Sequence, residues 1–302
     1  MMEFRYLKYF VTLAEELNFS RAAARLHISQ PPLTRQIQQL EAELGCELFF
    51  RGSRGVELTL AGQSLLKDAL GIMSLVGASK ERACKAGRGE IGKLEVGIFG
   101  SAILSHIPRI LFEFRNLYPE VEITLHQQTK AEQIQALRER RLTIGFNRHI
   151  PVEPDIIIET IFLEPLVIAL HNKHPLARHK SLRIAQIVEE PLILYPRNTR
   201  PGFADDVMAL FRNEGSTPRI TQEVTDVVTS IALVSSGFGI CVAPQAVMNL
   251  KLPGVVYRPI KATPAPTIEF ACLYRREDES PILAAILKVV RKFKPSFTEP
   301  CV

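Results

Sequence analysis

The stretch of sequence that decides the fold runs from residue 20 to residue 45 and reads SRAAARLHISQPPLTRQIQQLEAELG. Its three alanines, residues 22–24, remove side-chain bulk, as is needed where another helix crosses closely, and a short helix is predicted from Ser20 to about His27. Pro31 and Pro32 then favour the start of a second helix, because proline fits a first turn in which its missing N–H would have no partner. This helix is expected to reach about Leu44. The stretch therefore predicts a short helix, a turn and a longer helix.

The longer helix is expected to have two different faces. Apolar residues recur at helical spacing on the face that should pack, and these are Leu33, Ile37, Leu40 and Leu44. Polar residues and a proline fall on another face, and these are Pro31, Thr34, Arg35 and Gln38. One face should therefore pack against the domain while the other points outward.

A further helix and a hairpin flank this pair of helices. Apolar residues at helical spacing predict a helix over residues 4–17, and the polar residues that follow it can cap the next helix. After Gly45, Leu48 and Phe50 alternate into the loop RGSRG at residues 51–55, and residues 56–58 alternate back. The pattern predicts a small hairpin wing with arginines at its tip.

Thr59 can cap a long helix that extends to about Ala86. Its apolar stripe consists of Leu66, Ala69, Leu70, Met73 and Val76. A lone helix of this length cannot bury such a stripe, so pairing with the same helix of a second subunit is expected. The alternative, in which the stripe packs on its own chain, stays open.

Beyond this helix, strands and helices alternate. GRGEIG at residues 87–92 follows a helix and precedes a strand, so it is interpreted as a hinge rather than a dinucleotide-binding loop. The expected parallel α/β order is strand 94–99, helix 103–117, strand 121–127, helix 131–140 and strand 143–146. A second α/β unit is expected from strands 155–171, 192–195 and 219–224, helix 203–215, and a helix running into a strand over 229–242. Strand 267–274 and helix 281–294 should then return to the first unit.

Composition bounds the class of protein. Lysine and arginine number 37 against 32 acidic residues, which gives a net charge of +5, but residues 1–60 hold seven of each sign. DNA binding must therefore depend on how the basic side chains are arranged, and Arg21, Arg25, Arg35, Arg51 and Arg54 supply such an arrangement.

The five cysteines lie far apart without metal-ligand spacing, so reduced thiols and no metal or cofactor are expected. With no signal peptide and no membrane span predicted, a cytoplasmic location without a membrane partner is expected.

The outward face of the longer helix and the wing carry the candidate DNA contacts. A helix-turn-helix presents the N-terminal part of its second helix to the major groove of double-stranded DNA. Arginine can bind guanine or phosphate there, and glutamine can read adenine edges. The candidates are Ser29, Gln30, Pro31, Pro32, Thr34, Arg35 and Gln38 on the helix, and Arg51 and Arg54 on the wing.

Residues 4–59, and above all AAARLHISQPPLTRQI at 22–37 with Leu40-Glu41 and Leu44-Gly45, closely resemble LysR-type transcriptional regulators. The resemblance implies an all-α winged helix-turn-helix domain joined to an α/β effector domain of two subdomains, like type 2 periplasmic binding proteins. The implied boundaries are 1–60 for the DNA-binding domain, 61–90 for the linker helix and hinge, and 91–302 for the effector domain. Within the effector domain, subdomain I would span about 91–162 and 268–302, and subdomain II about 163–267.

QPPLTRQ at residues 30–36 and RGSRGV at 51–56 resemble the branch of that family that governs breakdown of aromatic compounds, including regulators that answer to muconates and benzoate. The resemblance implies control of promoter activation, a homo-oligomer built as a dimer of dimers, and a small carboxylate effector. RNA polymerase is a further partner that stays open. Activation and repression are not distinguished by the sequence.

The same resemblance implies an effector site between the subdomains, formed by Ser101, Thr129 and a segment containing Asn198, Pro201, Gly202 and Phe203. Physical reasoning supports it in part, because Ser101 and Thr129 each follow a predicted strand and precede a predicted helix, where free N–H groups attract a carboxylate. Arg148, Arg197 and Arg200 are candidate anion partners, and Asn147 stands where the family commonly has glycine. The alternative is that both hydroxyls only cap helices, and Thr129 to Glu132 matches a capping box.

Two other classes of function are weighed. The sequence contains no GxSxG, HExxH or P-loop motif, so an enzyme is not expected. His171, His174 and His179 are close together but are interpreted as part of a polar loop rather than a metal site. A transport solute-binding protein would fit the α/β part alone, but the helix-turn-helix argues against it.

Overall fold

The computed structural model describes residues 3–52, 55–195 and 202–294, and its contacts divide the chain into two compact units, residues 1–85 and 86–302. Each unit has its own hydrophobic core. The domain boundaries inferred from the sequence stay a prediction. No helix over the described residues is both long enough and apolar enough to cross a membrane.

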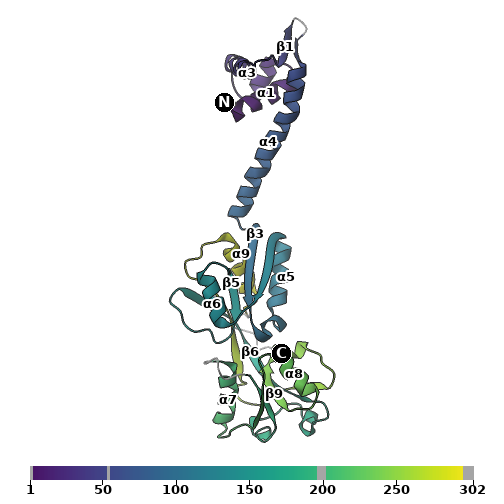
Figure 1. Ribbon diagram of the computed structural model, residues 1–302, viewed down its shortest axis with the longest axis vertical. Helices are drawn as coiled ribbons and strands as arrows, with labels where there is room; N and C mark the ends of the chain where they lie inside the picture. Colours follow the sequence, from purple (N-terminus) through teal and green to yellow (C-terminus); the bar gives the residue numbers. More distant parts are fainter. Residues whose placement is uncertain (1–2, 53–54, 196–201, 295–302) are drawn as a thin grey trace. The chain divides into compact units, whose positions relative to one another are not determined.

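The N-terminal unit is built on three helices (Figure 1), which are α1 Phe4–Glu16, α2 Phe19–Arg25 and α3 Gln30–Leu44. These helices confirm the expected ones to within two residues. The α3 side chains Leu33, Ile37 and Leu40 are fully buried in the core, whereas Leu44 is 42% exposed. Leu44 differs because it lies in the last turn of α3, directly before Gly45 ends the helix in the left-handed conformation.

The predicted wing is a two-stranded antiparallel hairpin of β1 Phe49–Gly52 and β2 Gly55–Leu58. It is followed by α4, Leu60–Gly87, whose first turn is closed by the Thr59 hydroxyl accepting from the Gly62 N–H at 3.0 Å. A Cβ on Gly62 would lie 2.2 Å from the Leu48 carbonyl oxygen. Glycine therefore allows α4 to pack directly against the base of the wing.

The predicted stripe of α4 divides into two parts. Ala69 is buried in the core of the N-terminal unit, and Leu66 and Met73 pack against that core. Leu70 and Val76 are exposed, as are the nearby side chains Ile72 and Leu75. Packing on the same chain therefore accounts for only one part of the stripe.

Over the described residues, the C-terminal unit has nine strands in the order β4-β3-β5-β11-β6-β9-β7-β8, with β10 also paired to β6. They are β3 Ile91–Ile98, β4 Glu120–Gln127, β5 Ile144–Asn147, β6 Ile156–His171, β7 Leu192–Leu194, β8 Ile220–Glu223, β9 Ile240–Pro244, β10 Val255–Pro259 and β11 Thr267–Arg275. The parallel pairing of β3 with β4 and β5 confirms the expected α/β order. The antiparallel β6 and β11 pair, and β10, were not predicted from the sequence.

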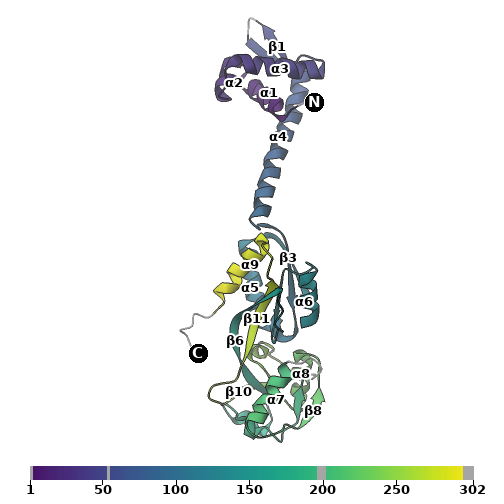
Figure 2. The same cartoon turned by 90° about the vertical axis from the view of Figure 1, so that its left-hand side faces the viewer.

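The long strand β6 joins two lobes of the C-terminal unit (Figure 2). Residues 156–165 of β6 pair with β11, residues 166–169 pair with β9, and residues 167–171 pair with β10. We call the part containing β3, β4 and β5 lobe I, and the part containing β7 to β10 lobe II. The two lobes have separate hydrophobic cores, and β6 and β11 run side by side from one to the other.

In lobe I, α5 Ile107–Leu117 and α9 Pro281–Lys292 cover one side of the sheet and α6 Lys130–Arg138 the other (Figure 2). Lobe II contains α7 Phe203–Asn213 and α8 Val227–Ser235. Short 3-10 helices span Gly100–Leu104, Pro175–Arg178, Ile184–Gln186 and Gln245–Asn249.

The expected helix over 103–117 is wrong in its first turn. The structure has the 3-10 helix Gly100–Leu104 and then α5, with Pro108 in the first turn of α5. Proline has no N–H to continue a helix, and its ring would collide with the carbonyl four residues earlier. The chain therefore breaks before residue 107 and restarts there.

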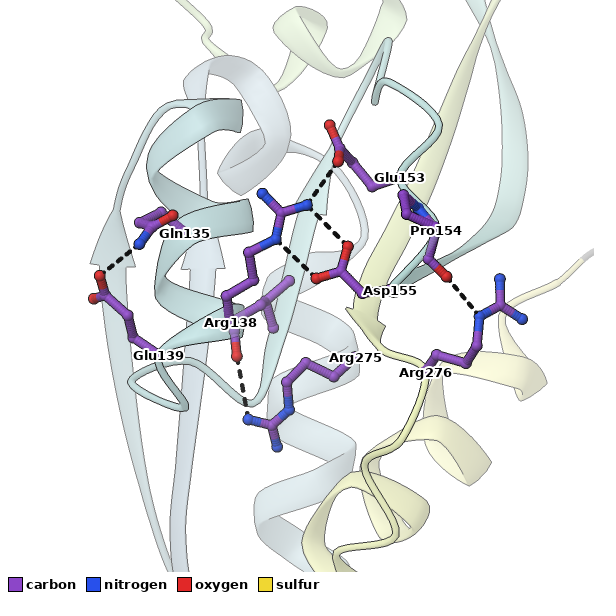
Figure 3. Close-up of polar contacts among 9 residues, drawn as sticks. Gln135, Arg138, Glu139, Glu153, Pro154, Asp155, Arg275 and Arg276 are labelled. Atoms are coloured by element: carbon purple, nitrogen blue, oxygen red, sulfur yellow. Dashed lines mark hydrogen bonds and ion pairs between the residues drawn. The ribbon is translucent and has the colours of Figure 1, made fainter.

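The segment between β5 and β6 is fastened at its far end (Figure 3). Arg138 on α6 donates to both carboxylate oxygens of Asp155 at 2.8 Å and to Glu153 at 2.6 Å. Arg276 donates to the Pro154 carbonyl at 2.9 Å. The Arg138 hydrogen bonds lower the pKa of Asp155 to about 2. This segment begins with Arg148 and His149, so its anchoring bears on the site described next.

Candidate functional site

The outer face of α3 brings the helix candidates together. Thr34 is half-buried, and the other six side chains are exposed, namely Ser29, Gln30, Pro31, Pro32, Arg35 and Gln38. A shallow groove on this face is lined by Gln30, Pro31, Thr34, Arg35 and Gln38. Ser20 on α2 donates to the Gln30 side-chain oxygen at 3.0 Å, which ties the start of α3 to the preceding helix.

Arg35 differs from Arg21 and Arg25, two other candidate arginines of the N-terminal unit. It makes no hydrogen bond or ion pair within the described ranges, so its donors are available to another molecule. Arg21 pairs with Glu16, and Arg25 pairs with Glu15 at 2.7 Å and Glu16 at 3.1 Å.

The wing arginine Arg51 forms contacts within the N-terminal unit. Its guanidinium pairs with Glu41 of α3 and lies 5.7 Å from the ring centre of Phe19. The same Glu41 carboxylate accepts from the N–H groups of Leu48 at 2.9 Å and Phe49 at 3.3 Å. Glu41 therefore ties the wing to α3, a role that the helical pattern did not reveal because its partners follow the helix. Arg54, the other wing candidate, lies outside the described residues.

Within the C-terminal unit, a cavity of about 340 Å³ lies where lobes I and II meet. It is lined by residues from both, namely Phe99, Gly100, Ser101, Thr129, Lys130, Asn147, Arg148, His149, Tyr195, Gly202, Phe203, Ala204, Thr225, Asp226, Val227 and Pro244. The structure thus brings together Ser101, Thr129, Arg148, Gly202 and Phe203, five of the seven effector candidates. The other two, Asn198 and Pro201, fall outside the described residues, as do Arg197 and Arg200.

Ser101 and Arg148 form the polar end of the cavity. The buried Ser101 hydroxyl accepts from Arg148 Nη1 at 3.1 Å, which leaves its own O–H able to donate. Arg148 also forms a buried ion pair with Glu164 of β6, and Glu164 accepts from the Ala246 N–H at 2.7 Å. Phe270 lies beneath the guanidinium, 5.1 Å from its ring centre. The arginine is therefore fixed and its charge is balanced before any ligand enters.

The expectation that Ser101 directly precedes an α-helix is wrong, because Pro108 delays the start of α5 until residue 107. Ser101 lies in the five-residue 3-10 helix, and its side chain caps neither that helix nor α5. Other helices supply N-termini at the cavity instead. α6, α7 and α8 each begin at a lining residue, which are Lys130, Phe203 and Val227. Their first N–H groups and their dipoles favour a negative ligand.

Thr129 caps α6, as the capping-box alternative predicted. Its hydroxyl accepts from the Glu132 N–H at 3.4 Å, while its own N–H and O–H donate to the Glu132 carboxylate at 2.7 and 2.8 Å. These hydrogen bonds lower the pKa of Glu132. Both donors of Thr129 are thus engaged, so a ligand would have to replace Glu132 to receive them.

Sequence reasoning missed most of the apolar wall. Tyr195 and Phe203 meet edge to face with ring centres 5.3 Å apart, and Phe99, Val227 and Pro244 complete the wall. The Tyr195 hydroxyl lies 3.4 Å from Ser230 Oγ, and burial raises the pKa of Tyr195 well above the ordinary value. Apolar residues at the ends of strands resemble core residues in a sequence, so no pattern separates them.

Lys130 and His149 were also missed. Lys130 Nζ donates to the His149 carbonyl at 3.0 Å, and burial lowers the pKa of Lys130. His149 Nε2 lies 2.5 Å from Asp206 Oδ2 on α7. By contrast, His174 of the polar loop has a structural role, because its Nδ1 accepts from the Leu176 N–H at 3.2 Å.

Comparisons with known proteins identify the family. The family described as bacterial regulatory helix-turn-helix protein, lysR family, matches residues 4–63, and the family described as LysR substrate binding domain matches residues 87–294. The HTH-type transcriptional regulator TcbR of Pseudomonas sp. (strain P51) is 39% identical over 291 residues, covering 96% of this chain and 99% of TcbR.

Solved structures agree with this similarity. The crystal structure of CbnR, a LysR family transcriptional regulator, has a TM-score of 0.90 and 39% identity, covering 96% of this chain and all of CbnR. Full-length CbnR complexed with its target DNA gives a TM-score of 0.87 at 38% identity, covering 97% of this chain and all of CbnR. The BenM effector binding domain with its effector benzoate gives 0.63 at 28% identity, covering 69% of this chain and 96% of that domain.

The chain therefore belongs to the LysR family of transcriptional regulators, which confirms the resemblance seen in residues 4–59. Its relatives are regulators of transcription and not enzymes. It combines a helix-turn-helix with an effector-binding domain of mixed α/β structure.

Proposed function

We propose that this regulator controls promoter activation in response to a small carboxylate, muconate-like or aromatic, that binds in the cavity between lobes I and II. The observation that carries the proposal is the Ser101–Arg148 pair at the buried end of that cavity. The Ser101 O–H can donate to a carboxylate oxygen, and the N-termini of α6, α7 and α8 add a favourable field. The proposed contacts are Ser101, Thr129, Arg148, Asn198, Pro201, Gly202 and Phe203.

Two further features support an unsaturated or aromatic acid. Tyr195 and Phe203 offer flat apolar surfaces to a planar ligand. The volume of about 340 Å³ suits a small molecule. Benzoate, an aromatic carboxylate, is the effector of BenM, whose effector domain shares the fold.

For DNA, we propose that the outer face of α3 enters the major groove of promoter DNA and that Arg35 contacts a base or phosphate there. The proposed contacts are Ser29, Gln30, Pro31, Pro32, Thr34, Arg35, Gln38, Arg51 and Arg54. CbnR, which is similar along its whole length, has been seen bound to its target DNA.

The exposed apolar side chains of α4, Leu70, Ile72, Leu75 and Val76, support a homo-oligomer paired through this helix. A dimer of dimers, with RNA polymerase as a further partner, completes the proposal. The proposal also includes the predicted domain boundaries at residues 60 and 90 and the division of residues 91–302 into two subdomains.

Calorimetric titration of the full chain with benzoate and with cis,cis-muconate tests the effector class. Ser101→Ala should weaken binding of the active compound about tenfold to a hundredfold, because a hydrogen bond to a charged group is lost. Ser105→Ala is the matched control, since Ser105 is close in sequence but does not line the cavity. Equal affinity of the wild type and Ser101→Ala would place the effector elsewhere.

A further inference from the structure

We propose that His149 and Asp206 form a clasp between lobes I and II that holds them at the separation the effector requires. The proposal rests on the effector cavity proposed above, and it concerns two residues that position the lobes. His149 comes from lobe I, just after β5, and Asp206 comes from the first turn of α7 in lobe II. Their side chains meet across the junction, with Nε2 and Oδ2 2.5 Å apart.

The contact is shielded from water although the side chains are not deeply buried. The His149 side chain is 21% exposed and that of Asp206 is 38% exposed, yet the two facing atoms have almost no contact with solvent. Neither atom makes a hydrogen bond within the described part of the chain, so their approach is an electrostatic contact and not a hydrogen bond. Shielding strengthens an electrostatic contact relative to one on an open surface. His149 also has a φ of +51°, in the left-handed region, where residues other than glycine are uncommon. The surrounding contacts must therefore hold it in that conformation.

Those contacts fix the His149 segment to lobe I at three points. Arg148, directly before His149, donates to Ser101 of lobe I, and it also pairs with Glu164 on the connecting strand β6. The His149 carbonyl accepts from Lys130 at the start of α6. The far end of the segment is fastened by Arg138 to Asp155 (Figure 3). Because the segment cannot follow lobe II, a separation of the lobes would have to break the His149–Asp206 contact.

Neighbouring charges favour the same arrangement. Burial lowers the pKa of Lys130, and the nearby carboxylates of Asp205 and Asp206 partly oppose that shift. Asp205 is held in the first turn of α7, where its carboxylate accepts from the Gly202 N–H at 2.9 Å. The Lys130 ammonium of lobe I therefore lies near two carboxylates of lobe II, and the attraction opposes opening.

The clasp is placed where it can affect the cavity. His149 lines the effector cavity and also a second hollow of about 230 Å³. Asp206 lines the second hollow, together with Ile158 of β6 and Ile268 of β11, two of the strands that connect the lobes. The contact thus stands between the cavity and the connecting strands, so breaking it would change the width of the cavity without removing a group from its polar end.

Asp206 does not line the effector cavity, so this position predicts that Asp206 affects affinity without touching the effector. If the binding-competent arrangement is only partly populated, the apparent dissociation constant rises in inverse proportion to the competent population that remains. His149→Gln and Asp206→Asn keep the size of each side chain but weaken the contact. Each should weaken effector binding about fivefold, as expected for a partly exposed polar contact.

Hydrogen–deuterium exchange of the full chain, measured without effector, tests the clasp itself. In His149→Gln and in Asp206→Asn, amides of residues 203–207 and 148–150 should exchange about fivefold faster than in the wild type. The double variant should match either single variant, since one contact is lost in all three. Titration with benzoate or cis,cis-muconate, whichever binds the wild type, should show the same pattern.

His174→Gln is the matched control, because His174 Nε2 faces Glu190 at 3.2 Å within lobe II and crosses no junction. It should leave exchange at residues 203–207 unchanged. Exchange as slow in the two clasp variants as in the wild type would overturn the proposal, and so would independent, additive effects in the double variant. If neither acid binds the wild type, the proposed effector class fails, while the exchange result still decides the clasp.

Discussion

The outer face of α3 and the effector cavity are both candidate binding surfaces, but they differ in whether their charged side chains are paired within the protein. On α3, all the candidates come from residues 29–38 of one segment, and Arg35 makes no ion pair within the described residues. In the cavity, the lining residues range from 99 to 244, and Arg148 already has a carboxylate partner in Glu164. A surface that meets a polyanion can leave its cations unbalanced, because the partner brings the opposite charge. A buried site must balance its charges before the ligand arrives.

The largest effect is expected from Glu164→Ala, which tests the balanced charge of the cavity. The Glu164 and Arg148 side chains are 6% and 10% exposed, so the variant would leave a guanidinium buried without its carboxylate. Loss of one partner of such a pair should lower the free energy of unfolding of the C-terminal unit by about 3 kcal/mol. Urea unfolding followed by circular dichroism measures it.

Glu190→Ala is the control for that experiment, because the Glu190 side chain is 31% exposed and its partner is a histidine. It should cost less than about 1 kcal/mol. A similar small loss in Glu164→Ala would mean that water reaches Arg148, and the contrast between the two regions would weaken.

Arg35→Ala tests the unpaired positive charge on the outer face of α3. It should weaken binding to the operator by about 1–3 kcal/mol if Arg35 reads a base, with a smaller loss on random DNA. Gel shifts at two salt concentrations separate the cases, since a phosphate contact would weaken both DNAs equally and reduce the salt dependence. Arg25→Ala is the control, because Arg25 is paired with Glu15 and Glu16 and should change affinity little.

The smallest effect is expected from Thr129→Ala, a cavity residue whose donors are already engaged. Loss of the α6 cap should lower the free energy of unfolding by about 1 kcal/mol. The pKa of Glu132 should rise towards its ordinary value, because two donors to its carboxylate are weakened or lost, and an NMR titration can follow it. Effector affinity should fall less than in Ser101→Ala. A loss of affinity as large as in Ser101→Ala would show that the Thr129 donors leave the Glu132 carboxylate and bind the effector instead.

Sequence patterns predicted the α3 face almost completely, because the helical period alone decides which side chains share a face. The family resemblance, and not the patterns, pointed to Ser101 as an effector contact, and Arg148 was a candidate anion partner. The patterns could not show that the two are hydrogen-bonded or that Glu164 completes the group, because that contact depends on the strand order β3-β5-β11-β6. Antiparallel pairing with β11 joins segments more than a hundred residues apart, and no local pattern carries that information. The His149–Asp206 contact is hidden for the same reason.

The position of β11 also bears on the order in which the chain can fold during synthesis. β11 separates β5 from β6 in the sheet, and Phe270 and Cys272 belong to the core of lobe I. Lobe I therefore cannot complete its sheet until the ribosome has passed residue 275. Residues 166–260 supply nearly all of the lobe II core in one continuous segment, and the core of the N-terminal unit is complete earlier still. Domains tend to fold as units while the chain emerges, so a nascent chain would hold a finished DNA-binding unit well before it holds a finished sensor.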